Sequence, residues 1–177
     1  MSNTQTYIGV VFGGVSGEHN ISIKSAEVII KALTTGSNII RFKVISIYID
    51  KNGRWWSTQI AQKALKKGCE LEKHELPLSN TSKGFKELPK ETEKVDIWYP
   101  VLHGPNGEDG TIQGLFTLME KPFVGSGVLG SALGMDKLAM KAAFKAAGLP
   151  QVPYVSTEAQ TINNCKLLPL LIRRIEN

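Results

Sequence analysis

A histidine and two acids lie in a glycine-rich loop near the middle of the chain, in the segment 99–114, which reads YPVLHGPNGEDGTIQG. The histidine is His103, and the acids are Glu108 and Asp109. An imidazole and carboxylates can bind an amino acid or move protons, and glycines let the backbone approach a ligand closely. The loop is therefore a candidate ligand site. The structural alternatives are a half-buried histidine at a strand end and an aspartate that only shapes a turn.

A second glycine-rich turn, which begins at Gly13 and reads GGVSGEH, carries Glu18. It lacks the G-x-G-x-x-G spacing of a dinucleotide-binding loop. A carboxylate at this point would repel a pyrophosphate, but it would attract a positively charged group such as an amine. Glu18 is thus a candidate for binding an amino group. The alternative is that it only complements the dipole of the following helix.

Lys137 follows Asp136, which we expect to cap an alanine-rich helix that ends at Gly148 and Pro150. Cations are disfavoured at the positive end of a helix dipole, so a lysine in the first turn is unusual. It could reach an anion that the helix N-terminus also attracts, such as a nucleotide phosphate. The alternative is a side chain that extends into solvent.

Alternating strands and helices should position these loops. Strands are predicted where β-branched, aromatic and aliphatic residues run together, at 7–12, 41–49, 95–102, 122–124 and, as the start of a further strand, 152–155. Helices are predicted around 26–33, at 60–67, after an N-cap at Thr111, after Asp136, and at 167–175. A hairpin is expected on Asn52 and Gly53, and a peripheral hairpin or loop is expected over 68–94. This succession predicts an α/β fold, in which a parallel sheet gathers its loops at the carboxyl ends of the strands.

Composition excludes several classes of function. The 177 residues carry a net charge of +5, but the basic residues are scattered and interleaved with acids, so we expect no nucleic-acid binding. No apolar run is long enough for a membrane span, and the N-terminus lacks the pattern of a secretory signal, which favours the cytoplasm. Cys69 and Cys165 lie far apart, outside any metal-ligand spacing, so we expect neither a disulfide nor a metal site.

Three segments, GGVSGEHNISIKSA, LHGPNGEDGTIQG and GSGVLGSALGMDKLAMK, together resemble the D-alanine–D-alanine ligase family of the ATP-grasp superfamily, in the same order. The resemblance implies a Rossmann-like N-terminal α/β domain over residues 1–124, followed over 125–177 by the start of an ATP-grasp domain. Such ligases use ATP and Mg²⁺ to phosphorylate one D-alanine. The amine of a second D-alanine then displaces phosphate and gives the dipeptide used in peptidoglycan. The resemblance also implies a homodimer.

On the matching positions, the resemblance gives roles to residues singled out above. Glu18 would hold the ammonium group of the first D-alanine, and His103 and Gly104 would lie beside the same substrate. Glu18 and His103 are the catalytic candidates, and Ser22 is a further candidate for the substrate site. Lys137 would contact a phosphate of ATP, and the two acids of the central loop would shape the site.

The family pattern continues with groups that this sequence lacks before Asn177. They are a second lysine on a strand, a loop with a serine and a tyrosine, an arginine for the transferring phosphoryl group, and the ligands of Mg²⁺. Phosphoryl transfer depends on charge neutralisation by metal and cations, so we expect an N-terminal portion of a ligase that is inactive alone.

Three alternatives stay open at this point. The portion could belong to a D-alanine–D-lactate ligase, because the part that selects the second substrate is missing. It could be an α/β binding or dimerisation module that performs no chemistry. A nucleotide-binding domain of dehydrogenase type is disfavoured by the missing glycine spacing and by Glu18 in the turn.

Overall fold

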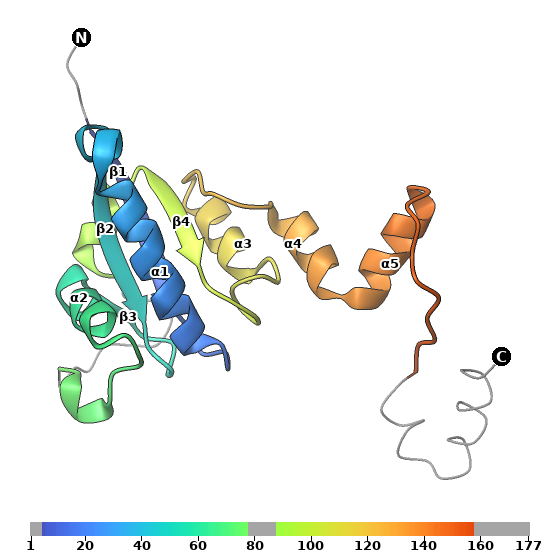
Figure 1. Ribbon diagram of the computed structural model, residues 1–177, viewed down its shortest axis with the longest axis horizontal. Helices are drawn as coiled ribbons and strands as arrows, with labels where there is room; N and C mark the ends of the chain where they lie inside the picture. The colour runs from blue at the N-terminus through green and yellow to red at the C-terminus, as the bar shows by residue number, and fades with distance from the viewer. Residues whose placement is uncertain (1–4, 78–87, 158–177) are drawn as a thin grey trace. The chain divides into compact units, whose positions relative to one another are not determined.

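The computed structural model describes residues 5–77 and 88–157, which include a four-stranded sheet covered by helices (Figure 1). The strand order is β3-β2-β1-β4. The central strand β1 (Thr6–Gly13) runs parallel to β2 (Phe42–Ile49) and to β4 (Ile97–Val101), while the short β3 (Trp55–Trp56) is antiparallel to β2. The predicted α/β class with a mainly parallel sheet is confirmed.

Five α-helices and three short 3-10 helices accompany the described strands. The α-helices are α1 (His19–Leu33), α2 (Thr58–Lys67), α3 (Thr111–Leu118), α4 (Val128–Met135) and α5 (Lys137–Ala146). The 3-10 helices are η1 (Gly36–Ile40), η2 (Lys73–Glu75) and η4 (Lys90–Lys94). The predicted first helix, the helix at 60–67 and the hairpin between β2 and β3 are therefore confirmed.

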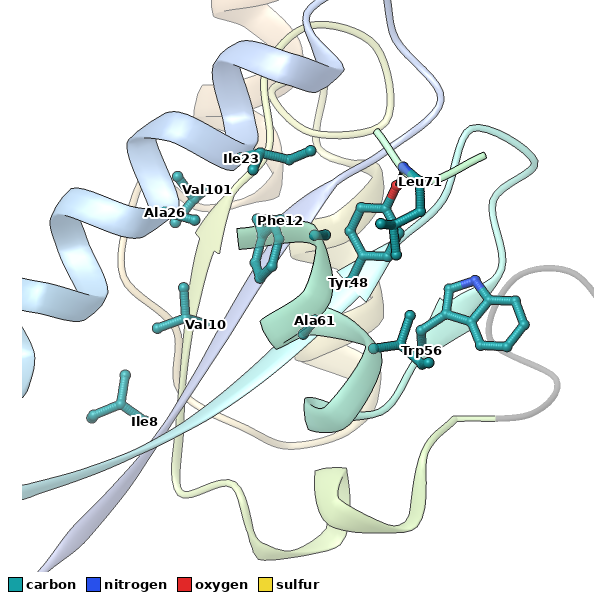
Figure 2. Packing of buried hydrophobic residues seen from close by; sticks show 12 residues of the cluster. Ile8, Val10, Phe12, Ile23, Ala26, Tyr48, Trp56, Ala61, Leu71 and Val101 are labelled. Atoms are coloured by element: carbon teal, nitrogen blue, oxygen red, sulfur yellow. Dashed lines mark hydrogen bonds between the residues drawn. The ribbon is translucent and has the colours of Figure 1, made fainter. Parts of the chain in front are cut away.

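One face of the sheet packs against α1 and α2. Alternate residues of β1 (Ile8, Val10 and Phe12) point to this face, because successive side chains of a strand point to opposite sides. Figure 2 shows them beside Ile23 and Ala26 of α1 and Ala61 of α2. The apolar stripes of both helices are thereby buried, which is the main source of stability for such a layer.

The opposite face packs against α3. Trp98 of β4 is fully buried and stacks on Phe116 of α3, with 4.9 Å between the ring centroids. Trp55 meets Trp98 edge to face at 6.1 Å. With both faces covered, the strands read as nearly continuous apolar runs, and these runs rather than an alternating pattern located them.

The outer edge of β4 is partly covered by the segment that follows α3. Trp98 N–H donates to Pro122 C=O (2.9 Å), and Val124 N–H donates to Trp98 C=O (2.8 Å). The brief strand predicted at 122–124 is reduced to this isolated bridge between Trp98 and Phe123. Further along β4, Pro100 has no N–H to offer.

The structure corrects three sequence predictions. Residues 152–155 do not form a strand. Instead, the ring of Tyr154 lies under the Lys141 ammonium at 4.5 Å, and the Gln151 side chain donates to Lys141 C=O, so the segment folds back along α5. Helix α4 was not predicted, because its sequence VLGSALGM contains two glycines. Thr111 is the first helical residue rather than the N-cap, which is Gly110.

The chain divides into two compact units, Met1–Met135 and Asp136–Asn177. In the second unit Asp136 caps α5 as predicted, because its carboxylate accepts the N–H groups of Leu138 and Ala139 at 3.0 Å. The domain boundary expected after residue 124 stays a prediction, and the helix expected at 167–175 lies outside the described residues. No helix in the described part of the chain is long and apolar enough to cross a membrane.

We expect Gly13→Ala to destabilise the chain by about 3 kcal/mol or more. Gly13 has φ of 95°, and a Cβ atom added there would lie 2.2 Å from the Ile49 carbonyl oxygen. Chemical denaturation measures the loss. The control is Gly17→Ala, whose Cβ would meet no atom within 4 Å and which should cost less than about 1 kcal/mol. Equal stability of the two variants would contradict the prediction.

Candidate ligand site

A cleft of about 560 Å³ lies at the edge of the sheet where the parallel strands end. It is formed by the turn after β1, the hairpin after β2, the loop after β4 and helix α3. Gly14 N–H donates to Ile49 C=O at 2.8 Å and holds the first two of these segments together. The residues that line the cleft are mostly apolar: Gly13, Gly14, Val15, Ile49, Gly53, Trp55, Leu102, His103, Pro105, Asn106, Gly110, Thr111, Ile112, Gly114, Leu115 and Leu118.

Glu18 and His103 belong to loops that touch each other at this edge. The Ser16 hydroxyl, from the loop of Glu18, donates to His103 C=O at 2.7 Å. A Cβ atom added to Gly104 would lie 3.2 Å from Glu18 Oε2, so the carboxylate sits directly against the backbone next to His103. Glu18 is exposed and His103 is half-buried. The structure thus places Glu18, His103 and Gly104 on adjoining loops, and of these three residues only His103 lines the cleft.

His103 lines the cleft, and its imidazole keeps unused hydrogen-bonding capacity. Its Nε2 atom is buried and has no partner among the described residues. A buried polar atom without a partner costs free energy, so such atoms in native proteins usually meet water or a ligand. His103 is therefore suited to contact a molecule bound in the cleft.

The two acids of the central loop are occupied by backbone groups. Glu108 accepts the N–H of Gly104 at 2.7 Å, and Asp109 accepts the N–H groups of Asn106 at 2.8 Å and Thr111 at 3.0 Å. Burial would raise the pKa of Asp109, but these hydrogen bonds outweigh it and lower the pKa. The interpretation of Asp109 as a residue that shapes the turn is confirmed, and Glu108 acts in the same way.

Ser22 lies beneath the site. Its side chain is fully buried; the hydroxyl accepts Gly13 N–H at 2.7 Å and donates to Val101 C=O. It therefore joins the ends of β1 and β4, and it is not among the residues that line the cleft. A direct contact between Ser22 and a substrate stays a prediction, while its observed partners give it a structural role.

A buried histidine that the sequence analysis did not single out supports the turn from behind. His19 is 1% exposed; its Nδ1 contacts Gly14 C=O, and its Nε2 lies 2.9 Å from the Tyr48 hydroxyl. Because a carbonyl can only accept, Nδ1 carries the proton. In the neutral ring Nε2 then accepts from the Tyr48 O–H, whose oxygen accepts Leu71 N–H at 3.3 Å. In the sequence, the one indication of this network is that a histidine follows Glu18 directly.

The environment of this network keeps both side chains neutral. Burial lowers the pKa of His19, and the nearby Lys51 adds to this, while the Gly14 hydrogen bond, Glu70 and Asp50 oppose it. Burial also raises the pKa of Tyr48 to about 12. A neutral pair that is linked to the backbone at both ends fixes the turn from Gly13 onward.

The hairpin wall of the cleft is held by Asp50, which is 2% exposed. Its carboxylate accepts the N–H groups of Asn52 and Arg54 and the indole N–H of Trp56. Sequence reasoning identified the turn residues of this hairpin but not its buried carboxylate. The available signal was an aspartate two residues before Asn52, since aspartate often accepts a hydrogen bond from the backbone two residues further on.

Lys137 is the first residue of α5, in the second unit, and its side chain is exposed. Its predicted contact with a nucleotide phosphate stays a prediction. Within residues 5–77 and 88–157, no group of three or more His, Cys, Asp or Glu side chains could hold a metal ion.

Fold and site together define a Rossmann-like α/β domain with a cleft outside the carboxyl ends of its parallel strands, where ligands bind in open α/β sheets. The chain belongs to the D-alanine–D-alanine ligase family, since the family model described as "D-ala D-ala ligase N-terminus" matches residues 7–126.

Individual relatives agree with this assignment. The chain is 57% identical over 169 residues to a D-alanine–D-alanine ligase of Synechococcus sp. (strain WH7803), which covers 96% of this chain and 48% of that protein. It is 59% identical to one of Prochlorococcus marinus (strain MIT 9313) over 90% of this chain and 45% of that protein. The chain thus spans about half the length of these relatives.

Solved structures give the same picture. The D-alanine–D-alanine ligase from Coxiella burnetii matches with a TM-score of 0.67 and 27% identity, over 96% of this chain and 49% of that one. The VanG D-Ala:D-Ser ligase from Enterococcus faecalis matches with a TM-score of 0.65 and 28% identity, over 98% of this chain and 49% of that one. The predicted family is therefore confirmed.

We expect the free energy of unfolding to fall as the pH drops below about 6.5. In the folded chain His19 stays neutral because burial lowers its pKa, whereas in the unfolded chain it takes up a proton near its ordinary pKa. Below that pH the unfolded chain therefore binds more protons than the folded chain. The contribution of neutral His19 to stability is complete above the ordinary pKa of histidine, and it is lost as the pH falls toward the pKa of His19 in the folded chain. Urea denaturation between about pH 8 and about pH 5 measures the loss.

The control for this prediction is His19→Gln, which removes the titrating group but keeps a polar side chain. The loss of stability over the same pH range should be smaller in this variant than in the original chain. An equal loss in both would show that His19 does not carry the effect.

Proposed function

We propose that this chain forms the first-substrate half of an ATP-dependent ligase that joins two D-alanine molecules into D-alanyl-D-alanine for peptidoglycan synthesis. The observation that carries the proposal is the position of the Glu18 carboxylate, which lies against Gly104 beside His103 at the carboxyl edge of the sheet. The relatives that bear this name are about twice as long, so the activity belongs to a protein that also contains the remaining half.

Glu18 would bind the ammonium group of the first D-alanine. Its carboxylate is exposed and accessible to a small molecule, and the residue immediately after it is the buried His19. A carboxylate and an ammonium group form a charge-assisted hydrogen bond, which is about twice as strong as a neutral one. The rigid turn holds the acid in place, so little entropy is lost when the amino acid binds.

His103 would contact the same D-alanine through the buried Nε2 atom that lacks a protein partner. Gly104, with φ of 71°, lets the backbone pass between the two side chains without a Cβ that would crowd the carboxylate. This gives an acid and an imidazole on adjoining loops, a pair suited to orienting an amino acid with both ends charged.

ATP and Mg²⁺ enter the proposal through the family. ATP would supply the phosphoryl group that activates the first D-alanine, and Lys137 at the start of α5 is the residue of this chain that we assign to one of its phosphates. The ligands of Mg²⁺ would come from the remaining half. We further propose that the whole protein is cytoplasmic and acts as a homodimer.

The choice of the second substrate belongs to the remaining half of the protein, and one structural neighbour illustrates this. The VanG protein, whose match covers 98% of this chain and 49% of the VanG chain, is titled a D-Ala:D-Ser ligase. The same N-terminal fold therefore occurs with a different acceptor. Ligases that form D-alanyl-D-lactate remain the alternative for this chain.

We expect Glu18→Gln to weaken D-alanine binding by about tenfold or more, because the substitution removes the charge that pairs with the ammonium group. An NMR titration of the ¹⁵N-labelled chain with D-alanine measures even weak affinity. The matched control is Glu27→Gln, an exposed acid within α1 that lies outside the glycine-rich turn of Glu18. The proposal fails if Glu18→Gln and Glu27→Gln bind D-alanine equally well.

We also expect the purified chain, mixed with ATP, Mg²⁺ and D-alanine, to release no phosphate above background. The groups that neutralise the charge of phosphoryl transfer are expected in the remaining half of the family pattern. A malachite green assay measures phosphate. Sustained release that depends on D-alanine would contradict this prediction and would place the complete machinery in these 177 residues.

A further inference from the structure

We propose that Ser16 is a positioning residue that sets the distance between the two substrate groups, Glu18 and His103, by joining their loops. Ser16 does not cap the helix that follows it, because the N-cap of α1 is Glu18. The inference rests in part on the proposed function, because it assigns the loops to one substrate.

Ser16 belongs to the loop of Glu18, and its hydroxyl forms hydrogen bonds with the backbone of both loops. It is 8% exposed, and its Oγ donates to His103 C=O at 2.7 Å while accepting the N–H of Glu18 at 3.2 Å. One hydroxyl therefore contacts the backbone of both substrate residues. Glu18 and His103 are 85 positions apart in sequence, and this side chain joins their loops beyond the point where β1 and β4 pair.

Two neighbouring contacts fix Ser16 itself. Its carbonyl oxygen accepts the Lys51 ammonium at 2.9 Å, which ties the loop to the hairpin after β2. On the other side, a Cβ atom at Gly104 would lie 3.4 Å from the Ser16 Cβ, so the loops are already in close contact. Because Ser16 belongs to the loop of Glu18 and bonds to the loop of His103, it couples the positions of the two loops.

The loss of this hydroxyl has a defined consequence. In Ser16→Ala the carbonyl of His103 and the amide of Glu18 lose their common partner, while the apolar packing below the loops is unchanged. The loops should then separate or become more variable, with the strands and helices intact. A substrate that must contact both loops would bind less well.

The first test needs no ligand. NMR spectra of Ser16→Ala should show displaced amide signals over residues 103–108 and an amide of Glu18 that exchanges with solvent about tenfold faster. The matched control is Ser131→Ala, which removes a 9% exposed hydroxyl that donates to Ser126 C=O at 3.3 Å in another part of the same unit. Signals over 103–108 that move no more than in the control would overturn the proposal.

The second test is a double-mutant cycle with D-alanine as the probe. Ser16→Ala should weaken binding about tenfold, and Ser16→Ala combined with Glu18→Gln should bind nearly as weakly as Glu18→Gln alone, because Ser16 acts through Glu18. Additive losses would indicate a general structural effect and would overturn the proposal.

The two proposals can fail separately. If the original chain and Glu18→Gln show the same response to D-alanine, the proposed function fails, and the ligand-free spectra still decide the role of Ser16. If Glu18→Gln weakens binding and Ser16→Ala leaves it unchanged, the role of Ser16 fails while the proposed function stands.

Discussion

The pairing of β1 between two parallel neighbours is the constraint on which the site depends. The register aligns Gly13 of β1 with Ile49 of β2, and Phe12 with Val101 of β4, so three strands end at the same level. The segments that follow them therefore begin side by side. At this level the backbone of β1 passes so close to Ile49 that only glycine fits at Gly13. Parallel order, strand length and one glycine together create the edge at which the cleft forms.

Buried polar groups then hold the loops in position at that edge. Ser22 joins the ends of β1 and β4, His19 with Tyr48 supports the turn from behind, and Asp50 closes the hairpin. Ser22 and His19 find partners on segments distant in sequence, whereas the partners of Asp50 lie within its own hairpin. A buried polar group without partners would cost free energy. The loops consequently have little freedom to rearrange, although they carry few apolar contacts of their own. A binding site on such a frame is largely formed before a ligand arrives.

Much of this could be predicted from the sequence, because the signals were local. Apolar runs located β1, β2 and β4, and the three glycine-rich segments identified Glu18, His103 and the family. What escaped prediction depends on distant contacts. His19 bonds to Gly14 and to Tyr48, and Tyr48 in turn accepts from Leu71. Helix α4 forms despite two glycines because it packs on α3. The strand expected at 152–155 does not form, because Tyr154 packs against the Lys141 ammonium of α5 and the segment does not pair with a strand.

The outer edge of β4 has a consequence for the behaviour of the chain in concentrated solution. An open strand edge is a template on which another molecule can add a strand, and this is a common start of aggregation. Here the bridge to Phe123 occupies the hydrogen-bonding groups of Trp98, and Pro100 offers no donor further along the same strand. The sheet therefore presents an interrupted row of donors and acceptors on this side, which discourages self-association through strand addition.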